Sequence, residues 1–331
     1  MPLSNNATYG VVPMTESINN LPSMPTQIRE SGLFVPDYLT TTYVDVESKS
    51  NQLTLVQSAT RGTPGKPVNE TRGGKKTFET VHLPKDDVVR ADDVQNVKAF
   101  GTSNTATAVN DKVNAKLEGM KSDIDYTREH LQLGALRGKL LDADGSLLYD
   151  FYKEFGIQRP TFTLNLTNKD ADIGGQTDKM LRQLLRALSG DVSTGWIAFA
   201  GEDFMDAYSY HPAIKALYDR YKESVGQYTG SVTANMAFQH RGVTFVPYLH
   251  QFGSEVDIKP DEALIAPLGT RKTLKEYFAP ADFNETVNTS AKPYYAAREP
   301  LKFNKGWQLH AQSNPLPIAL RPKALATLKM S

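Results

Sequence analysis

The stretch between Thr105 and Gly138 constrains the fold of this chain most, because it has a helical period and runs directly into a hairpin signal. Its apolar residues recur at spacings of three, four and seven, which is the pattern of one helix face. They are Val109, Val113, Leu117, Met120, Ile124 and Leu131. At 1.5 Å per residue, such a helix would be roughly 50 Å long. The sequence therefore predicts one unusually long helix over residues 104–138.

The opposite face of this helix is rich in charge. Its charged residues are Asp111, Lys112, Lys116, Lys121, Asp123 and Arg128. A face of this kind usually points into solvent, and we expect the same here.

A hairpin signal follows the helix at once. Asp144 and Gly145 tolerate the positive φ of a two-residue type I′ turn, so a hairpin with that turn is expected. Asp142 and Asp144 have the spacing of the first two ligands of a calcium loop. However, the glycine comes at the fourth position and Lys153 stands where that loop needs a glutamate. The hairpin explains these residues better.

A two-stranded ribbon is predicted upstream of the helix. The strand-forming segments "TTTYVDVESKSNQLTLV" and "TFETVHLPKD" flank a tip rich in Gly and Pro. Two strands alone bury too little apolar surface to be stable in water. Something outside the ribbon must therefore hold it.

The N-terminal residues, 1 to about 28, are rich in Pro, Asn, Ser and Thr. Pro13, Pro22 and Pro25 are expected to break any helix or central strand, so the segment is interpreted as an extended arm. A disordered tail is the alternative.

The remainder mixes both kinds of secondary structure. "TDKMLRQLLRALSG" predicts an amphipathic helix ending at Gly190, and residues 195–221 predict a buried strand followed by helix. Two strand-like runs flank Arg241 and Gly242, which predicts a second hairpin. Because strands and helices do not alternate regularly, the expected class is α+β.

Composition excludes several function classes. Lys plus Arg and Asp plus Glu both number 37, so a net charge of +0 provides no global attraction to nucleic acid. The absence of cysteine excludes disulfides and thiolate chemistry. The sequence contains no run of about 18 apolar residues, so no membrane-spanning helix is predicted. A soluble protein that acts without secretion is expected.

No motif demands an enzyme. In "RGTPGKP", only two residues separate Gly62 from Gly65 and Pro67 follows Lys66, so a phosphate-binding loop is not formed. The histidines match no metal signature; they are His82, His130, His211, His240, His250 and His310. Glu202 and Asp203 fit the start of a helix better than an acid and base pair. We therefore assign no catalytic, cofactor-binding or metal-binding residue; a hydrolase using Asp203 and His211 is the remote alternative.

Three blocks, in this order along the chain, resemble the major capsid protein E family of tailed bacteriophages, the lambda-type head proteins. They are "DYTREHLQLGALRGKLLDADGSLLYDFYKEFG", "YFAPADFNETVNT" and "EPLKFNKGWQLHAQSNPLPIALRPKALATL". The resemblance implies the Hong Kong 97-like capsid fold, an α+β fold with a defined set of regions. These would be an N-terminal arm (1–40), an E-loop (41–88), a peripheral domain (89–190) with the spine helix at 104–138, an axial domain (191–299), and a return strand of the peripheral domain (300–331).

The resemblance also implies a function. The chain would be a structural major head protein, not an enzyme, that forms hexamers and pentamers of an icosahedral shell around double-stranded DNA. Expected partners are other copies of itself, a scaffolding protein and the portal, with the packaged DNA contacted non-specifically at most; the presence of a head decoration protein is left open. It would be assembled in the host cytoplasm and be found in the virion, with no membrane contact.

Two points stay open at the level of sequence. Some relatives cross-link subunits through Lys and Asn, and Lys66, Lys75 and Lys76 are available, but the lambda-type branch is not expected to do so. A nanocompartment shell or a tail-tube component is the alternative assembly.

Overall fold

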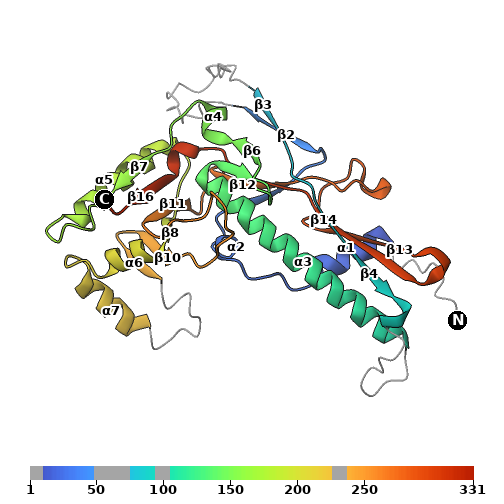
Figure 1. Ribbon diagram of the computed structural model, residues 1–331. Coiled ribbons are helices and arrows are strands. Elements are labelled where there is room, and N and C mark those ends of the chain that lie inside the picture. The colour runs from blue at the N-terminus through green and yellow to red at the C-terminus, as the bar shows by residue number, and fades with distance from the viewer. Residues whose placement is uncertain (1–9, 48–74, 94–104, 226–236) are drawn as a thin grey trace, which may run out of the picture. The chain divides into compact units, whose positions relative to one another are not determined.

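The computed structural model describes residues 10–47, 75–93, 105–225 and 237–331. The chain is α+β, as predicted (Figure 1). It contains two compact units: unit 1 is Met1–Val44, Glu79–Gln132 and Glu276–Ile318, and unit 2 is Asp45–Phe78, Leu133–Lys275 and Ala319–Ser331. These units divide the chain at other places than the expected domain boundaries at 190 and 299, which stay a prediction.

The predicted long helix is confirmed as α3 (Thr105–Arg137). Its apolar stripe from Val113 to Leu131 is buried, and the side chain of Val109 lies outside the described residues. The helix ends at Gly138, whose φ is +81°. A Cβ at this position would lie 2.0 Å from the Tyr152 ring, so glycine is required both by conformation and by space.

Unit 1 is built around an antiparallel sheet of β4 (Leu83–Arg90), β13 (Tyr295–Pro300) and β14 (Gly306–Ser313), with β14 in the centre. Apolar residues of α1 and α3 pack with this sheet into one core; they include Met14, Ile18, Val89, Val113, Leu117, Ile124, Ala296 and Leu309. A second sheet has the order β1 (Val35–Tyr38), β12 (Leu274–Phe278), β15 (Pro315–Ala319).

The expectation of an extended or disordered N-terminal segment is wrong for most of its described part. Residues Val11–Asn20 form helix α1 and Gln27–Glu30 form helix α2. Pro13 lies in the first turn of α1, where a backbone N–H has no partner within the helix and its absence does no harm. Met14 and Ile18 are buried one turn apart. Burial against β13 and α3 therefore outweighs the low helix propensity of this segment.

Unit 2 contains a six-stranded sheet in the order β7-β16-β11-β8-β10-β9. Its strands are β7 (Thr161–Thr163), β8 (Gly195–Ala200), β9 (Phe238–His240), β10 (Val243–Pro247), β11 (Glu262–Leu268) and β16 (Ala326–Lys329). Helices α5 (Ile173–Ala187), α6 (Glu202–Ser209) and α7 (Lys215–Val225) follow the expected positions. The core joins Met180 and Leu184 of α5 to Trp196 and Ala198 of β8.

The two predicted hairpins are both present, but one turn differs. β9 and β10 pair across Arg241 and Gly242, which both have positive φ, as a type I′ turn requires. β5 (Lys139–Leu141) and β6 (Leu147–Asp150) pair across a longer loop in which the Asp142 amide donates to Ser146. Only Gly145 there has positive φ, so the predicted two-residue turn at Asp144 and Gly145 is wrong.

The predicted ribbon is shorter than expected where the structure describes it. β2 (Tyr43–Glu47) pairs with β3 (Lys75–Glu79). The second predicted strand is split in two: its first residues belong to β3, and its last residues form the start of β4, which pairs with β14. The predicted ribbon tip, Gly62 to Lys76, lies outside the described residues except for Lys75 and Lys76, which begin β3. Within unit 2, Phe78 of β3 is buried against Tyr149, Phe151 and Phe155, of β6 and helix α4 (Phe151–Phe155). Residues outside the ribbon thus hold its base.

Candidate functional site

A buried polar network lies on α3 in unit 1. Lys121, Asp125, Arg128, Glu129 and Gln132 recur at spacings of three and four, so they share one side of the helix. All five are at most 6% exposed. The expectation that Lys121 and Arg128 lie on a solvated face is therefore wrong. The N-terminal segment and Tyr294 contact this side of α3 and exclude water from it.

The network binds the backbone of the N-terminal segment. The Lys121 ammonium donates to the carbonyl oxygens of Ile18 (3.0 Å) and Leu21 (2.6 Å), at the end of α1. The carbonyl groups at a helix C-terminus have no partner within the helix and attract a cation. Lys121 therefore caps α1 from α3.

Two carboxylates on α3 accept from backbone amides further along the same segment. Asp125 Oδ2 accepts from the amide of Met24 at 3.0 Å, and Glu129 Oε1 accepts from the amide of Ile28 at 2.9 Å. Met24 lies between the two helices, and Ile28 lies in the first turn of α2, where backbone N–H groups have no acceptor within the helix. These side chains therefore supply partners that secondary structure does not. The chain path from α1 to α2 is thus fixed by one side of α3.

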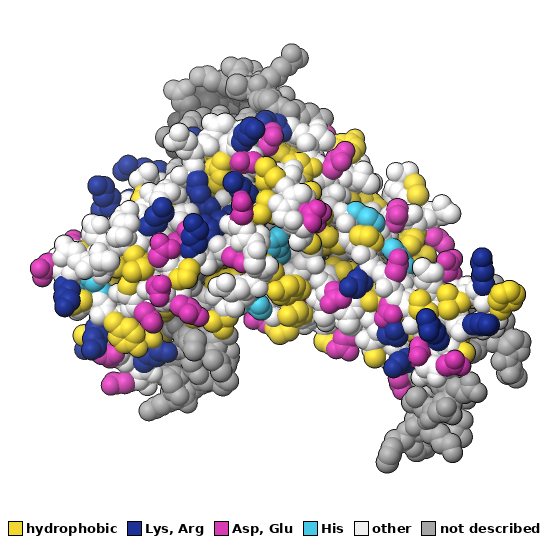
Figure 2. All heavy atoms as spheres, in the orientation of Figure 1, with side chains coloured by type: hydrophobic (Ala, Val, Ile, Leu, Met, Phe, Trp, Pro, Cys, Tyr) yellow, Lys and Arg dark blue, Asp and Glu magenta, His cyan; other side chains and the backbone are white. Residues whose placement is uncertain are grey.

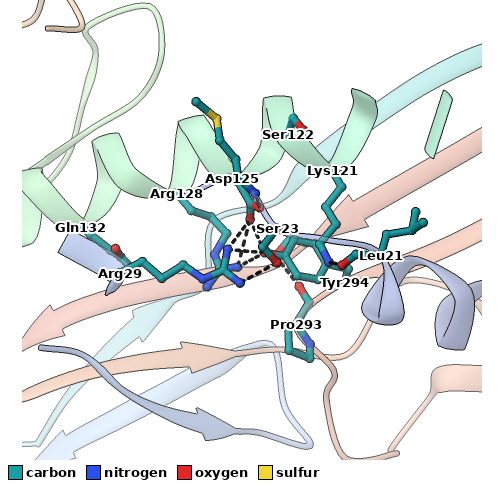
Figure 3. Close-up of polar contacts among 12 residues, drawn as sticks. Leu21, Ser23, Arg29, Lys121, Ser122, Asp125, Arg128, Gln132, Pro293 and Tyr294 are labelled. Atoms are coloured by element: carbon teal, nitrogen blue, oxygen red, sulfur yellow. Dashed lines mark hydrogen bonds and ion pairs between the residues drawn. The ribbon is translucent and has the colours of Figure 1, made fainter. Parts of the chain in front are cut away.

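A second layer joins α3 to β12 and to the residue before β13. Arg128 forms a two-pronged ion pair with Glu276, at 3.1 Å and 2.8 Å, and also donates to the Tyr294 hydroxyl. The same hydroxyl donates to Asp125. Arg29 of α2 reaches Asp125 at 3.0 Å. Figure 3 shows Arg29, Arg128 and Asp125 converging on Tyr294 from α2 and α3.

The charges of the network compensate each other. Its three cations are Arg29, Lys121 and Arg128, and its three carboxylates are Asp125, Glu129 and Glu276. Charges are buried at an acceptable free energy only when they are paired and hydrogen-bonded in this way.

The pKa shifts of Arg128, Tyr294 and Lys121 reflect the balance between burial and neighbouring charges. Burial alone would lower the pKa of Arg128, but Glu276, Tyr294 and Asp125 outweigh burial and raise it. Burial raises the pKa of Tyr294, so its hydroxyl keeps its proton at neutral pH and can donate to Asp125. Burial lowers the pKa of Lys121, and Asp125 opposes that shift. The contacts of the site attach the N-terminal segment to α3.

The sequence did not identify most of this site. Arg29, Glu276 and Tyr294 are distant in sequence from α3, and no motif marks them. One signal was available: the polar residues of α3 from 121 to 132 repeat at helical spacing within a helix that is solvated further upstream.

The hydrolase alternative finds little support in the geometry. His211 is buried, its Nε2 lies 2.9 Å from the carbonyl oxygen of Asn168, and its Nδ1 accepts from the amide of Ala213 at 3.2 Å. Both ring nitrogens are thus engaged by backbone. Asp203 and Glu202 lie exposed in the first turn of α6, where carboxylates stabilise the helix dipole.

The other candidates are placed as follows. Lys76 forms an ion pair with Glu154 at 2.8 Å, and the side chains of Lys66 and Lys75 lie outside the described residues. Among the residues that the structure describes, no group of three His, Asp or Glu side chains is arranged to hold a metal ion. Over the same described ranges, no helix has the length and apolar character needed to span a membrane.

Known proteins give the context for this fold. The chain is 24% identical to the major capsid protein of Salmonella phage Felix O1, an alignment that covers 98% of this chain and 97% of the relative. It is also 24% identical to the major capsid protein of Pseudomonas phage KPP10, over 97% and 96%. Among solved structures, the capsid asymmetric unit of cyanophage A-1(L) is similar with a TM-score of 0.48 and 12% identity, covering 93% of each chain. The mature capsid of bacteriophage PhiM1 has a TM-score of 0.47 and 12% identity, over 94% of this chain and 89% of that one.

The family match extends over almost the whole sequence. Residues 10–330 match the family described as phage major capsid protein E. The match includes the N-terminal segment, α3 and both compact units. The sequence-based expectation of a bacteriophage capsid protein with an α+β fold is therefore confirmed at the level of the family, and the chain belongs to the phage major capsid protein E family.

Proposed function

We propose that this chain is the structural major head protein of a tailed bacteriophage, with the Hong Kong 97-like fold. Copies of it assemble into hexamers and pentamers of an icosahedral shell that encloses packaged double-stranded DNA. The family match over residues 10–330 is the observation that carries the proposal. The two capsid relatives support it, because each aligns over nearly its full length.

The described structure is consistent with a subunit of this kind. The polar network gives the N-terminal segment from α1 to α2 a fixed path on α3. The ribbon base is held by Phe78 and the ion pair of Lys76 with Glu154, whereas two strands are too few to be stable alone. We assign the ribbon to the E-loop, which contacts a neighbouring copy.

The partners follow from the same assignment. The chain acts with other copies of itself, with a scaffolding protein and a portal during assembly in the host cytoplasm, and with a head decoration protein on the finished head. It is a structural component of the virion and performs no catalysis. Packaged DNA is contacted through its backbone and without sequence preference.

Sedimentation of the full chain tests this function. The chain alone or with its scaffolding protein should form hexamers, pentamers or shells as concentration rises. Sedimentation that shows only monomer under both conditions contradicts the proposal. Tubes in place of closed particles would indicate a tail-tube component, and closed particles that form and function without a portal would indicate a nanocompartment shell.

Deletion of residues 63–72 tests the E-loop assignment. Unfolding of the deletion variant should resemble wild type, because the described cores of both units are built from residues in other parts of the chain. Electron microscopy should show loss of stable shells. Normal mature shells from the variant exclude the E-loop assignment, and global unfolding of the variant shows that the ribbon belongs to the folding core.

A further inference from the structure

Helix α5 of unit 2 has a solvent-facing stripe of cations. Lys179, Arg182 and Arg186 follow at spacings of three and four and lie on the side opposite the buried Met180 and Leu184. All three side chains are exposed. Figure 2 shows Lys and Arg side chains gathered over the part of the molecule that Figure 1 labels α5, β7 and β16. We call Lys179, Arg182 and Arg186 the α5 stripe.

The α5 stripe has no counter-charge within the part of the chain that the structure describes. No ion pair or hydrogen bond involves these three side chains in the described ranges. Asp178, which is one turn before Arg182, is bonded to Arg241 at 2.5 Å. Elsewhere the protein does pair cations at its surface: the exposed Lys85 with Asp123 and the half-buried Lys116 with Asp87, both at 2.7 Å.

The stripe also repels itself. Arg182 and Arg186 are four residues apart on one face, and like charges at this spacing destabilise a helix. The helix dipole offsets this for Arg186 in the last turn, but not for Lys179 and Arg182 in the middle of the helix. A ligand with regularly spaced negative charge would remove the repulsion.

We infer that the α5 stripe binds the phosphate backbone of duplex DNA. Lys179 to Arg186 covers roughly 10 Å along the helix, over which one strand of B-DNA carries about three phosphates. Three cations thus face about three phosphates. This inference rests on the proposed function, since that function brings DNA inside the shell, and it names the surface that contacts it.

Duplex DNA fits the stripe better than a protein partner. Protein interfaces gain most of their affinity from buried aromatic and apolar anchors, whereas Gln183 lies between the cations on this line and one half-exposed aliphatic residue, Leu185, lies beside it. Long, flexible cations without a shaped pocket are typical of contacts that hold a nucleic-acid backbone and read no bases.

The affinity expected of one subunit is low, which agrees with the net charge of +0. Three phosphate contacts predict that the logarithm of the association constant falls with the logarithm of salt concentration with a slope of about −2.7. In a shell, many copies would act on one DNA molecule, so weak single contacts add to a strong total attachment. Neutral composition therefore does not exclude a local DNA-binding face.

The test uses the full chain and a fluorescent 24-base-pair duplex of mixed sequence, with anisotropy measured from low to physiological salt. The variant K179Q/R182Q/R186Q should bind at least tenfold more weakly at low salt, with a slope near zero. The control variant K112Q/K302Q/K305Q removes three exposed cations of unit 1 and should bind within twofold of wild type. The variant K179R/R182K/R186K keeps the charge and should also bind normally, which separates lost charge from a lost fold.

Two outcomes overturn the inference. One is equal weakening of binding in the glutamine variant and the control, which would mean that net charge alone decides. The other is unchanged DNA binding together with failed shell assembly in the glutamine variant, which would make the stripe a contact between copies. Shell formation by wild type is measured in parallel, so failure of the proposed function is distinguished from failure of this inference.

Discussion

Helices α3 and α5 carry similar charged residues, which are buried and paired on α3 but exposed and unpaired within the described residues on α5. On α3, Lys121 and Arg128 are buried, and each bonds to a carboxylate or to backbone carbonyls. On α5, Lys179, Arg182 and Arg186 are exposed, and in the described part of the chain none has a partner. Charge on a helix therefore has two uses in this protein, and burial decides which one applies.

The charged residues of α3 have a structural role that those of α5 lack. The polar network on α3 stabilises a long helix by attaching the N-terminal segment and β12 to it, so its charges belong to the fold. The α5 stripe contributes nothing that the fold requires, since Met180 and Leu184 hold α5 in the core. Substitutions should consequently affect stability on α3 and ligand binding on α5.

The largest effect is expected for Glu276→Gln. The change leaves the buried Arg128 without its main counter-charge, and breaking a buried pair by removing one partner costs about 3–5 kcal/mol. Urea unfolding should shift to clearly lower concentration, and amides of α3 should exchange faster. The double variant R128M/E276L should recover much of the loss, because two apolar groups replace the pair. An unchanged unfolding midpoint for Glu276→Gln would show that the network is not structural.

A smaller effect is expected for Lys121→Met. Methionine fills similar space but leaves the carbonyl groups of Ile18 and Leu21 without their donor, at about 1–3 kcal/mol. Hydrogen exchange of residues 11–30 should increase, with no change in α5. Lys112→Met, at an exposed position of the same helix, is the matched control and should behave like wild type. Equal exchange in both variants would contradict the capping role of Lys121.

The third effect depends on pH and concerns the end of α3. Burial alone would raise the pKa of Glu262, but its ion pair with Arg137 and the Lys259 amide lower it below the ordinary value of 4.5. The unfolded carboxyl group thus takes up a proton at pH values where the folded one stays charged, and stability falls as pH drops below about 4.5. Glu262→Gln should reduce this acid sensitivity, measured as the pH dependence of the urea midpoint. Identical pH dependence of the urea midpoint in wild type and Glu262→Gln would show that Glu262 does not cause the acid sensitivity.

The smallest effect has the opposite sign. Arg182→Glu on α5 removes a repulsive pair and creates a favourable one with Arg186 four residues later, but it also places a like charge four residues after Asp178. A net stabilisation of less than about 0.5 kcal/mol is therefore expected. The melting temperature should stay the same or rise slightly, while binding to the DNA duplex weakens. A clear loss of stability would mean that Arg182 has a structural role and would break the contrast with α3.

The sequence predicted α3 well because its apolar stripe from Val113 to Leu131 repeats over many turns, a signal that context rarely overrides. It also predicted the turn at Arg241 and Gly242, where local chemistry determines the geometry. The N-terminal segment was mispredicted because Pro13 was judged as a helix breaker, whereas its position in the first turn of α1 is compatible with a helix. The rest of the stability of α1 comes from burial of its apolar residues against residues distant in sequence, which no local sequence pattern reveals.

The buried network was not predictable in the same way. Lys121 and Arg128 have the same spacing and residue types as an ordinary solvated face. Their burial depends on Tyr294 and Glu276, which are about 150 residues away or more. The α5 stripe, in contrast, could have been seen in "TDKMLRQLLRALSG", but a basic helix face becomes informative only when the structure shows that no described carboxylate forms an ion pair with it.

Cryo-electron microscopy of the particles formed by this chain with its scaffolding protein and portal tests the central claim most directly. We expect closed icosahedral shells of hexamers and pentamers with one vertex occupied by the portal. In every subunit, α3 and the attached N-terminal segment should be resolved. Open tubes, or a chain that stays monomeric with folded units 1 and 2, would contradict it.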